Sequence, residues 1–426
     1  MTLIMFGTLL ILLLINVPIA VALGLASFAA LQFGTMPTPL LLVAQRMFTS
    51  VDSFPFMAIP FFMLAGCIME SGGISRRLIN FAKTIVGGLP GGLGVITIVA
   101  SAFFGAISGS NPATVAAIGG IMIPSMIRAG YPKDFASAIA AAGGTLGVII
   151  PPSIPMITYG VVAGVSIGAL FIAGIIPGII MAMGLVLVVI MYSKKLDLKG
   201  EERSTFKDFL KAGKEAILAL MMPVIILGGI YGGVFTPTEA AAVAVVYAFI
   251  VSMFIYREIC IKDMGKIIVK AGISTSVVLL VIATSASFSW LITSAQIPAA
   301  VTKSMLSIST NIFVLTLLIN ILLLVLGTFL ETQAIILLIA PILLPLAVVI
   351  GIDPLLLGII MVVNTSVGMI TPPLAVNLFV ACGISNLRIE QISRKIIPFL
   401  IIELITVVLI TNFPKLSMWL PQVLMK

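Results

Sequence analysis

The fold is decided by a short stretch that occurs twice. Gly147-Val148-Ile149-Ile150-Pro151-Pro152 returns 221 residues later as Gly368-Met369-Ile370-Thr371-Pro372-Pro373. At the same offset Pro124 matches Pro345 and Gly130 matches Gly351. Apolar matches arise easily in an apolar chain. Gly and Pro residues that keep the same offset all the way from Pro124 to Pro152 do not. The sequence therefore predicts an internal repeat, with a proline pair that breaks a helix in each copy.

Composition places both copies in a membrane. Of 426 residues, 61% are hydrophobic and 9% are charged, whereas soluble domains average about 45–50% apolar and about 25% charged residues. This composition excludes a soluble protein. A nucleic-acid binder is excluded as well, because the basic residues stand in short clusters between apolar runs. His is absent, which excludes imidazole metal sites and Ser-His catalysis. The three cysteines show no CxxC spacing, and we interpret them as packing residues.

Five clusters of basic residues predict which side each loop faces. They are Arg76, Arg77 and Lys83; Arg128 and Lys133; Lys194 to Lys214; Arg257 to Lys270; and Arg388 to Lys395. The positive-inside rule assigns all five to the cytoplasm. Three full crossings between Lys270 and Arg388 would contradict that assignment. The contradiction disappears if 311–349 is a re-entrant hairpin, and the same reasoning makes 92–127 a hairpin.

The two copies are predicted to be inverted, because Arg388 is assigned to the cytoplasm and its counterpart Ile167 to the outside. Inverted repeats with interrupted helices are typical of secondary transporters. We therefore expect an all-α polytopic membrane protein in which each repeat holds a re-entrant helical hairpin and a broken transmembrane helix. The expected parts are scaffold helices over 1–56; a first transport region over 57–192, with hairpin 92–127 and broken helix 135–163; a cytoplasmic linker over 193–215; scaffold helices over 216–270; a second transport region over 271–413, with hairpin 311–349 and broken helix 355–385; and a tail over 414–426.

The first hairpin turns at Ser108-Gly109-Ser110-Asn111-Pro112-Ala113-Thr114. Asn111 suits a helix N-cap and Pro112 suits the first helical turn. Polar residues gathered in an apolar segment favour a site where Ser108, Ser110 and Asn111 offer oxygens to a cation or meet a substrate carboxylate. The alternative is a well-capped turn that binds nothing.

The second hairpin turns near Gly327-Thr328-Phe329-Leu330-Glu331-Thr332-Gln333. An acidic residue at membrane depth is costly, which makes Glu331 a functional candidate. Its carboxylate suits Na⁺ together with hydroxyl and carbonyl oxygens, or it carries a proton. The alternative is a carboxylate that only satisfies a helix N-terminus.

Each hairpin tip is expected to face a broken helix. The first break is Gly143-Gly144-Thr145-Leu146-Gly147 before Pro151 and Pro152, and the second is Asn364-Thr365-Ser366-Val367-Gly368 before Pro372 and Pro373. Gly relaxes the helix and Pro frees carbonyls. Freed backbone is tolerated at membrane depth only where it is buried in protein or lines a cavity. A pair of oxygen-lined cages is predicted, with kinks that bind nothing as the alternative.

Two features are predicted to be structural. Glu239 follows Thr236-Pro237-Thr238, which is the pattern of a capping box that begins a helix. The segment 2–30 is apolar throughout, and Pro18 makes it either one kinked span or a pair of short helices.

The chain resembles the large membrane subunit of tripartite ATP-independent periplasmic (TRAP) transporters. The resemblance is carried by Gly228 through Ala242, Gly147 through Tyr159, and Ala173-Gly174-Ile175-Ile176-Pro177-Gly178, and it extends over nearly the whole chain. It implies an elevator-type, Na⁺-coupled importer of a small organic acid in the bacterial inner membrane. It also implies two partners, a small four-helix membrane subunit and a soluble periplasmic binding protein. This chain begins directly with the large subunit, so the small subunit is expected to be a separate polypeptide.

The resemblance also implies site residues and a substrate class. Two or more Na⁺ ions are expected at Ser108, Asn111, Gly144, Thr145 and Gly147, and at Thr328, Glu331, Thr365 and Gly368. The substrate is expected near Ser110, Asn111, Pro151, Pro152, Asn364 and Pro372. Sialic acid is the first expectation and a C4-dicarboxylate the second. A self-sufficient carboxylate:cation symporter is a further alternative; an enzyme is disfavoured because the chain lacks a nucleophile–base pair, and a channel because broken helices suit a carrier.

Overall fold

The computed structural model describes residues 1–15, 17–34, 39–202 and 204–425, and within these ranges every regular element is helical. Nine of the described helices are long and apolar enough to cross a membrane. The expected all-α polytopic architecture is confirmed.

The first half of the chain forms fourteen elements. They are α1 (Thr2–Leu14), α2 (Ile19–Gln32), α3 (Leu41–Val51), the 3₁₀ helix η1 (Phe54–Met57), α4 (Ala58–Ser71), α5 (Ile74–Val86), α6 (Gly92–Ser108), α7 (Asn111–Thr114), the π-helix η2 (Val115–Gly119), α8 (Gly120–Arg128), α9 (Lys133–Gly144), α10 (Leu146–Ile149), α11 (Ile154–Ala163) and α12 (Ile167–Lys195). Segment 2–30 therefore contains a pair of short helices rather than one kinked span.

The second half continues from the linker. Its elements are α13 (Phe206–Tyr231), α14 (Pro237–Ile250), the π-helix η3 (Val251–Ile255), α15 (Ile261–Ser294), α16 (Ile297–Ile308), α17 (Ile312–Phe329), α18 (Thr332–Val349), α19 (Pro354–Gly368), α20 (Val376–Ser385), α21 (Ile389–Asn412) and α22 (Lys415–Leu424). The capping box at α14 is confirmed, because Glu239 Oε2 accepts from Thr236 N at 2.8 Å and Glu239 N donates to Thr236 Oγ1.

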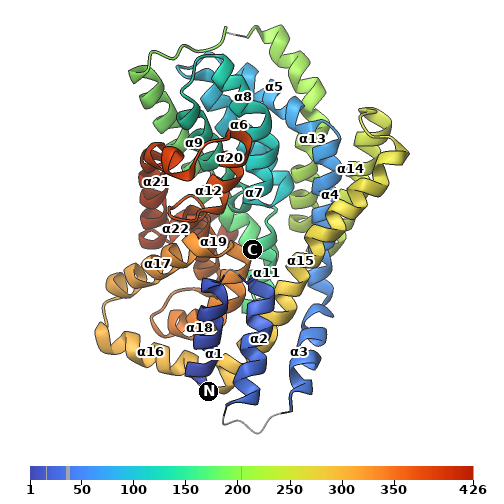
Figure 1. The fold of residues 1–426 in the computed structure, drawn as a ribbon. Helices are drawn as coiled ribbons and strands as arrows, with labels where there is room; N and C mark the ends of the chain where they lie inside the picture. The colour runs from blue at the N-terminus through green and yellow to red at the C-terminus, as the bar shows by residue number, and fades with distance from the viewer. Residues whose placement is uncertain (16, 35–38, 203, 426) are drawn as a thin grey trace.

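Both predicted hairpins and both predicted breaks are present. Helices α6 to α8 form the first hairpin and α17 with α18 the second; Figure 1 shows the first in the upper half of the molecule and the second in the lower half. The first break separates α10 from α11 and the second separates α19 from α20. Each break contains one of the proline pairs, Pro151-Pro152 or Pro372-Pro373. The two repeats thus approach the middle of the molecule from opposite ends, as inverted copies must.

The first hairpin turns sharply for a local reason. Gly109 has φ +59°, a left-handed conformation that ends α6 and that a side chain would oppose. The chain then resumes as a helix at Asn111, with Pro112 in the first turn, where the missing proline N–H costs nothing. The second hairpin turns through Leu330 and Glu331, both in extended backbone.

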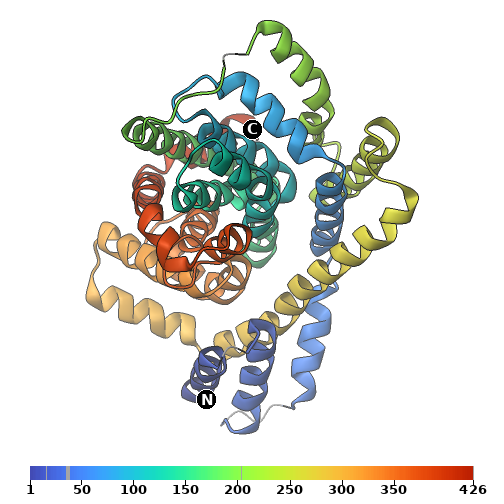
Figure 2. The same ribbon diagram turned by 45° about the horizontal axis from the view of Figure 1, so that its top comes forward.

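The helices form two groups, a core that contains the hairpin tips and an outer group beside it. The hairpins, the broken helices, α12 and α21 pack together as a core, whereas α4, α5, α13 and α14 pack on one another beside it. Helix α15 is 34 residues long and contacts α2, α3 and α4 as well as α18 of the core. Figures 1 and 2 both show α15 as a diagonal between the core and α3. The tips therefore meet a wall built by α4 and α15.

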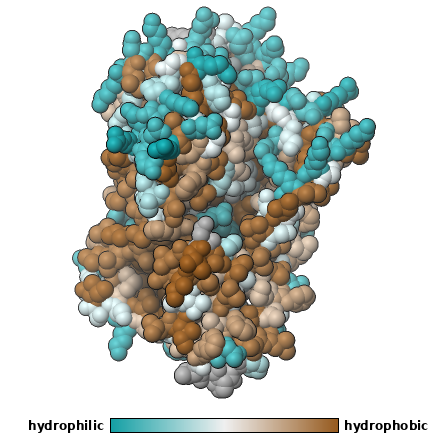
Figure 3. Space-filling model, viewed as in Figure 1, coloured by the Kyte–Doolittle hydropathy of each residue, from teal (hydrophilic) through white to brown (hydrophobic). Residues whose placement is uncertain are grey.

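Hydropathy differs between the two ends of the molecule. In Figure 3, hydrophilic residues gather at the upper end, and hydrophobic residues cover most of the middle and lower part of this face. Three ion pairs join elements within the described part: Arg77–Glu258, Lys83–Glu201 and Lys270–Glu70. All three basic partners belong to clusters that the positive-inside rule assigns to the cytoplasm.

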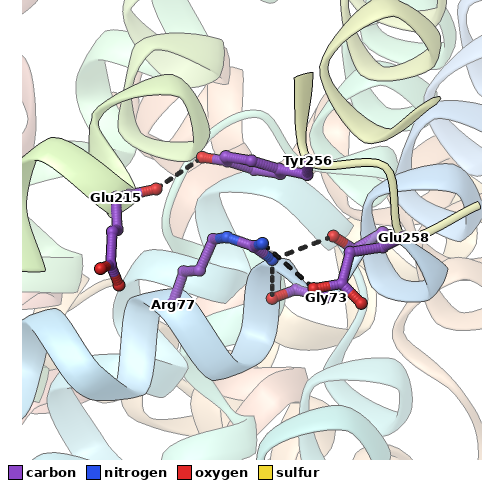
Figure 4. Close-up of polar contacts among 6 residues, drawn as sticks. Gly73, Arg77, Glu215, Tyr256 and Glu258 are labelled. Carbon is purple, nitrogen blue, oxygen red and sulfur yellow. Dashed lines mark hydrogen bonds and ion pairs between the residues drawn. The ribbon is translucent and has the colours of Figure 1, made fainter. Parts of the chain in front are cut away.

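A cluster around Arg77 fixes the start of α5, as Figure 4 shows. The Arg77 guanidinium lies 3.8 Å above the Tyr256 ring, 3.1 Å from Glu258 Oε1 and 3.0 Å from the Gly73 carbonyl. The Tyr256 hydroxyl donates to the Glu215 carbonyl at 2.7 Å. These contacts join α5 to α13 and to the segment that follows η3.

Candidate functional site

Each hairpin tip touches the broken helix of its own repeat through a glycine pair. A Cβ atom added at Gly105 would lie 3.0 Å from the Gly147 Cα, and one added at Gly327 would lie 2.9 Å from the Gly368 Cα. Neither position has room for a side chain, so the two backbones approach as only glycine permits. The same contact occurs in both repeats, which supports two related sites.

Asn111 bonds the first tip to both broken helices. It is fully buried, and its Oδ1 accepts from Val148 N at 2.9 Å. Its Nδ2 donates to Ser366 Oγ at 2.7 Å and lies 3.3 Å from Met369 Sδ. The amide oxygen thus bonds the broken helix of the first repeat, and the amide nitrogen bonds that of the second.

The chain of contacts continues away from the tip. Ser366 Oγ donates to the Thr145 carbonyl at 2.8 Å. The Thr145 hydroxyl lies 2.7 Å from Glu403 Oε1 and 2.7 Å from the Ala142 carbonyl. Glu403 is fully buried, and its Oε2 has no hydrogen-bond partner in the described part of the chain. Asn111, Ser366, Thr145 and Glu403 therefore form a polar path through an apolar core.

The first group of expected cation ligands lies together. The Ser108 and Thr114 hydroxyls are 2.9 Å apart, and Thr114 Oγ1 donates to the Ser110 carbonyl at 2.8 Å. Gly144 and Gly147 pack against this turn, Gly144 near the Asn111 carbonyl and Gly147 near Thr114. The Thr145 hydroxyl instead faces Glu403. Thr145 can therefore offer a cation at the tip only its carbonyl oxygen.

The second group also gathers at one place. Gly327 packs beside Thr365, and the Thr328 carbonyl accepts from Ala375 N at 3.2 Å. The hydroxyls of Thr328 and Thr365 both donate within their own helices, to Val325 and Met361. Their oxygens keep lone pairs, which suits a cation. Gly368 completes the contact, and Glu331 stands at the tip with its side chain exposed to a cavity.

Both tips border that cavity, which is small, at about 50 Å³. Its lining includes Ser110 and Asn111 from the first tip and Glu331 from the second. It also includes the first residues of three helical segments, which begin at Asn111, Ile154 and Thr332. Helix N-termini carry partial positive charge and unpaired N–H groups, so they attract anions. The helix N-termini therefore make part of the cavity favourable for an anion. The Glu331 carboxylate makes another part favourable for a cation.

A wider cavity of about 520 Å³ shares Met63, Ser110, Pro112, Val278 and Glu331 with the first. One of its walls is α4 and α15, and the other is the first hairpin with Val380 of α20. The two cavities therefore lie side by side along the boundary between the core and the outer helices.

Four of the expected substrate residues lie elsewhere. Pro151, Pro152, Asn364 and Pro372 are not among the residues that line either cavity. Asn364 is buried, and its Nδ2 donates to the Asn320 side chain at 2.8 Å. The neighbours of the first proline pair, Ile154 and Pro155, take the cavity position instead.

Sequence reasoning missed several residues of the site, among them Glu403, Thr332 and Gln333. Glu403 carries the same signal that singled out Glu331, an acidic residue within an apolar span, and could have been found. Thr332 and Gln333 follow Glu331 and line the cavity. The Gln333 side chain donates to the Thr158 hydroxyl on α11, which joins the second tip to the first repeat. No pattern in the sequence points to that contact.

Comparison with known proteins decides the family. The family model described as "Tripartite ATP-independent periplasmic transporter, DctM component" matches residues 6–416. The chain belongs to this TRAP permease family. Membership confirms the resemblance seen in the sequence and makes the chain a transporter component of the inner membrane rather than an enzyme.

Curated TRAP relatives differ in the substrate that their names carry. The chain is 46% identical over 418 residues to the isethionate TRAP transporter permease protein DctMQ of Oleidesulfovibrio alaskensis, covering 98% of this chain and 66% of that protein. It is 39% identical over 436 residues to the C4-dicarboxylate large permease protein DctM of Rhodobacter capsulatus, covering 99% of each. It is 38% identical to the sialic acid large permease protein SiaM of Vibrio cholerae, covering 93% of each.

The fold of this TRAP permease chain is similar to that of a solved transporter structure. The crystal structure of the Alcanivorax borkumensis YdaH transporter matches with a TM-score of 0.63, covering 97% of this chain and 98% of the other. The two sequences are 17% identical, so the likeness concerns the fold alone.

Proposed function

We propose that this chain is the large permease subunit of a Na⁺-coupled TRAP importer that carries a small organic anion. The observation that carries the proposal is the cavity between the tips, where three helix starts and Glu331 meet. The helix starts favour the anion, and the carboxylate with the glycine-lined turns favours the cation. A cavity that attracts an anion, with a carboxylate beside it that attracts a cation, supports symport of an anion with Na⁺.

Two cation sites belong to the proposal. The first uses oxygens around Ser108, Asn111, Gly144, Thr145 and Gly147, and the second uses oxygens around Thr328, Glu331, Thr365 and Gly368. Their equivalent positions in inverted repeats support them, as do the matching glycine contacts. The substrate contacts Ser110 and Asn111 on one side and Glu331 to Gln333 on the other.

The proposed movement is that of an elevator. Both tips belong to the core, and the cavity lies where the core meets α4 and α15. A core that slides along this wall would carry the cavity from one side of the membrane to the other. The cross-repeat bonds of Asn111 and Gln333 support a core that moves as one body.

The partners follow from the family. A small membrane subunit of four helices and a periplasmic binding protein complete the importer, and the small subunit packs on the outer helices. Sialic acid is the first substrate to test, with C4-dicarboxylates and isethionate beside it because relatives carry those names.

Uptake into proteoliposomes tests the proposal. Vesicles holding this chain and its small subunit receive labelled N-acetylneuraminate, succinate or isethionate, with and without the binding protein, under an inward Na⁺ gradient. Uptake of one acid that needs both partners and Na⁺ is the expected result. Uptake by this chain alone would favour a self-sufficient symporter, and Na⁺-independent uptake would refute the cation sites.

A further inference from the structure

The wider cavity forms a lane that leads from the tips toward the basic end of α15. On α15 it touches Lys270, Ile273, Ser274, Val277 and Val278, which share one face of the helix. On α4 it touches Met63, Gly66, Cys67 and Glu70, again one face. Val278 also borders the tip cavity, so the lane runs about 12 Å along α15 from the tips to Lys270.

Lys270 is the one basic residue among the described residues that line the two cavities. Its Nζ lies 2.8 Å from Glu70 Oε2, and the two side chains are 56% and 31% exposed. An ion pair this exposed contributes little stability. An incoming anion can therefore take the place of Glu70 on the ammonium group at low cost.

We propose that Lys270 is an anion-binding subsite on the route between the hairpin tips and the cytoplasm, with Glu70 as the carboxylate that occupies it in the absence of a substrate. The ligand class is a small carboxylate or sulfonate, and the inference rests on the proposed import of an organic anion. An anion that leaves the helix starts finds Ser274 and then Lys270 along the same face of α15. Exchange between Glu70 and the anion then eases release.

Cys67 provides a probe within the lane, because it lines the same cavity one turn before Glu70. The other two cysteines, Cys260 and Cys382, are replaced by Ser in the full chain, purified with its small subunit. The measurement is the rate at which Cys67 reacts with anionic 2-sulfonatoethyl methanethiosulfonate, divided by the rate with the cationic trimethylammonioethyl reagent. Intact mass reports the mixed disulfide that forms as methanesulfinate leaves.

The subsite requires opposite effects from its two members. Lys270→Gln should lower the anion-to-cation rate ratio roughly fivefold, and Glu70→Gln should raise it by a similar factor. Lys266→Gln removes the same charge one turn away, at an exposed residue outside the lane, and should leave the ratio unchanged. Isethionate should slow the reaction of the anionic reagent in the parent chain and not in Lys270→Gln.

Several results would overturn the subsite. If Lys270→Gln and Glu70→Gln shift the ratio in the same direction or not at all, the pair is only a tether between α4 and α15. If neither reagent modifies Cys67, the lane is closed to anions. Because labelling needs no transport, these outcomes are independent of the uptake assay, which alone decides the proposed function.

Discussion

Asn111 Nδ2 lies 2.7 Å from Ser366 Oγ, so a side chain at the tip of the first hairpin is bonded to the broken helix of the second repeat. The Oδ1 of the same amide accepts from Val148 N in the broken helix of the first repeat. The tip is thus held between two segments that are far apart in the sequence. This relationship joins the two repeats at the first tip.

Replacing Asn111 by Ala should destabilise the subunit. The change leaves the buried Val148 N–H without its acceptor, which costs about 1–3 kcal/mol. The measurement is the thermal unfolding midpoint of the purified complex. Asn412→Ala is the matched control, because Asn412 is exposed near the end of α21 and a surface change of this kind costs within about 0.5 kcal/mol. Equal losses in both variants would contradict the role of Asn111.

Ser366→Ala should be coupled to Asn111→Ala. Both variants remove the same hydrogen bond, so the double variant should lose less stability than the two single losses together, by about 0.5–3 kcal/mol. A double-mutant cycle on the unfolding free energy measures this coupling. Strict additivity would mean that the contact contributes nothing.

Glu331→Gln should weaken the Na⁺ dependence of uptake more than it disturbs folding. The change keeps the size of the side chain and removes its charge, which should raise the half-saturating Na⁺ concentration roughly tenfold, or about 1.4 kcal/mol. Glu239→Gln serves as the control, because the Glu239 carboxylate belongs to a capping box outside the cavities. Unchanged Na⁺ dependence in Glu331→Gln would remove Glu331 from the second cation site.

Gly327→Ala should impair both folding and transport. The added methyl group would press on the Gly368 Cα at 2.9 Å, and overpacking of this kind costs about 1–3 kcal/mol. Gly265→Ala is the opposite case, since nothing lies within 4 Å of its added Cβ and Ala favours a helix by about 1 kcal/mol. Thermal unfolding and uptake of the two variants check the pair; a harmless Gly327→Ala would show that the contact is loose.

The architecture was predictable because its signals are local. Gly and Pro residues in register indicated the repeat, and the basic clusters indicated both hairpins. Each signal reflects a local free-energy cost, of unpaired backbone or of basic residues on the wrong side of the membrane, which distant contacts do not remove. Helices α5 and α16 escaped prediction because they are too short or too polar to resemble a span. Helix α15 spans Ile261–Ser294 and so crosses the expected boundary between 216–270 and 271–413, because its charged first turns also form a helix.

The direction of side chains was not predictable. Asn364 stands in a polar break, and the sequence does not reveal that its amide reaches Asn320 on α17. Thr145 and Glu403 meet across 258 residues, and hydropathy carries no information about such a pair. The sequence predicts Pro151 and Pro152 beside the substrate. The cavity is lined instead by Ile154 and Pro155, a few residues later in the chain.

Arg77→Ala should destabilise the junction between α4 and α5. The guanidinium stacks on Tyr256 at 3.8 Å and bonds both Glu258 and the Gly73 carbonyl, so its loss should cost about 1–3 kcal/mol. Arg77→Lys should recover only part of this, because an ammonium group lacks the planar fork that makes these contacts together. Arg76→Ala, at the exposed neighbouring position, is the control for charge. Thermal unfolding separates the three variants, and because α5 leads directly into the first hairpin, uptake should fall in the same order. If Arg76→Ala and Arg77→Ala behave alike, the cluster affects only surface charge and does not fix the angle at which α5 enters the core.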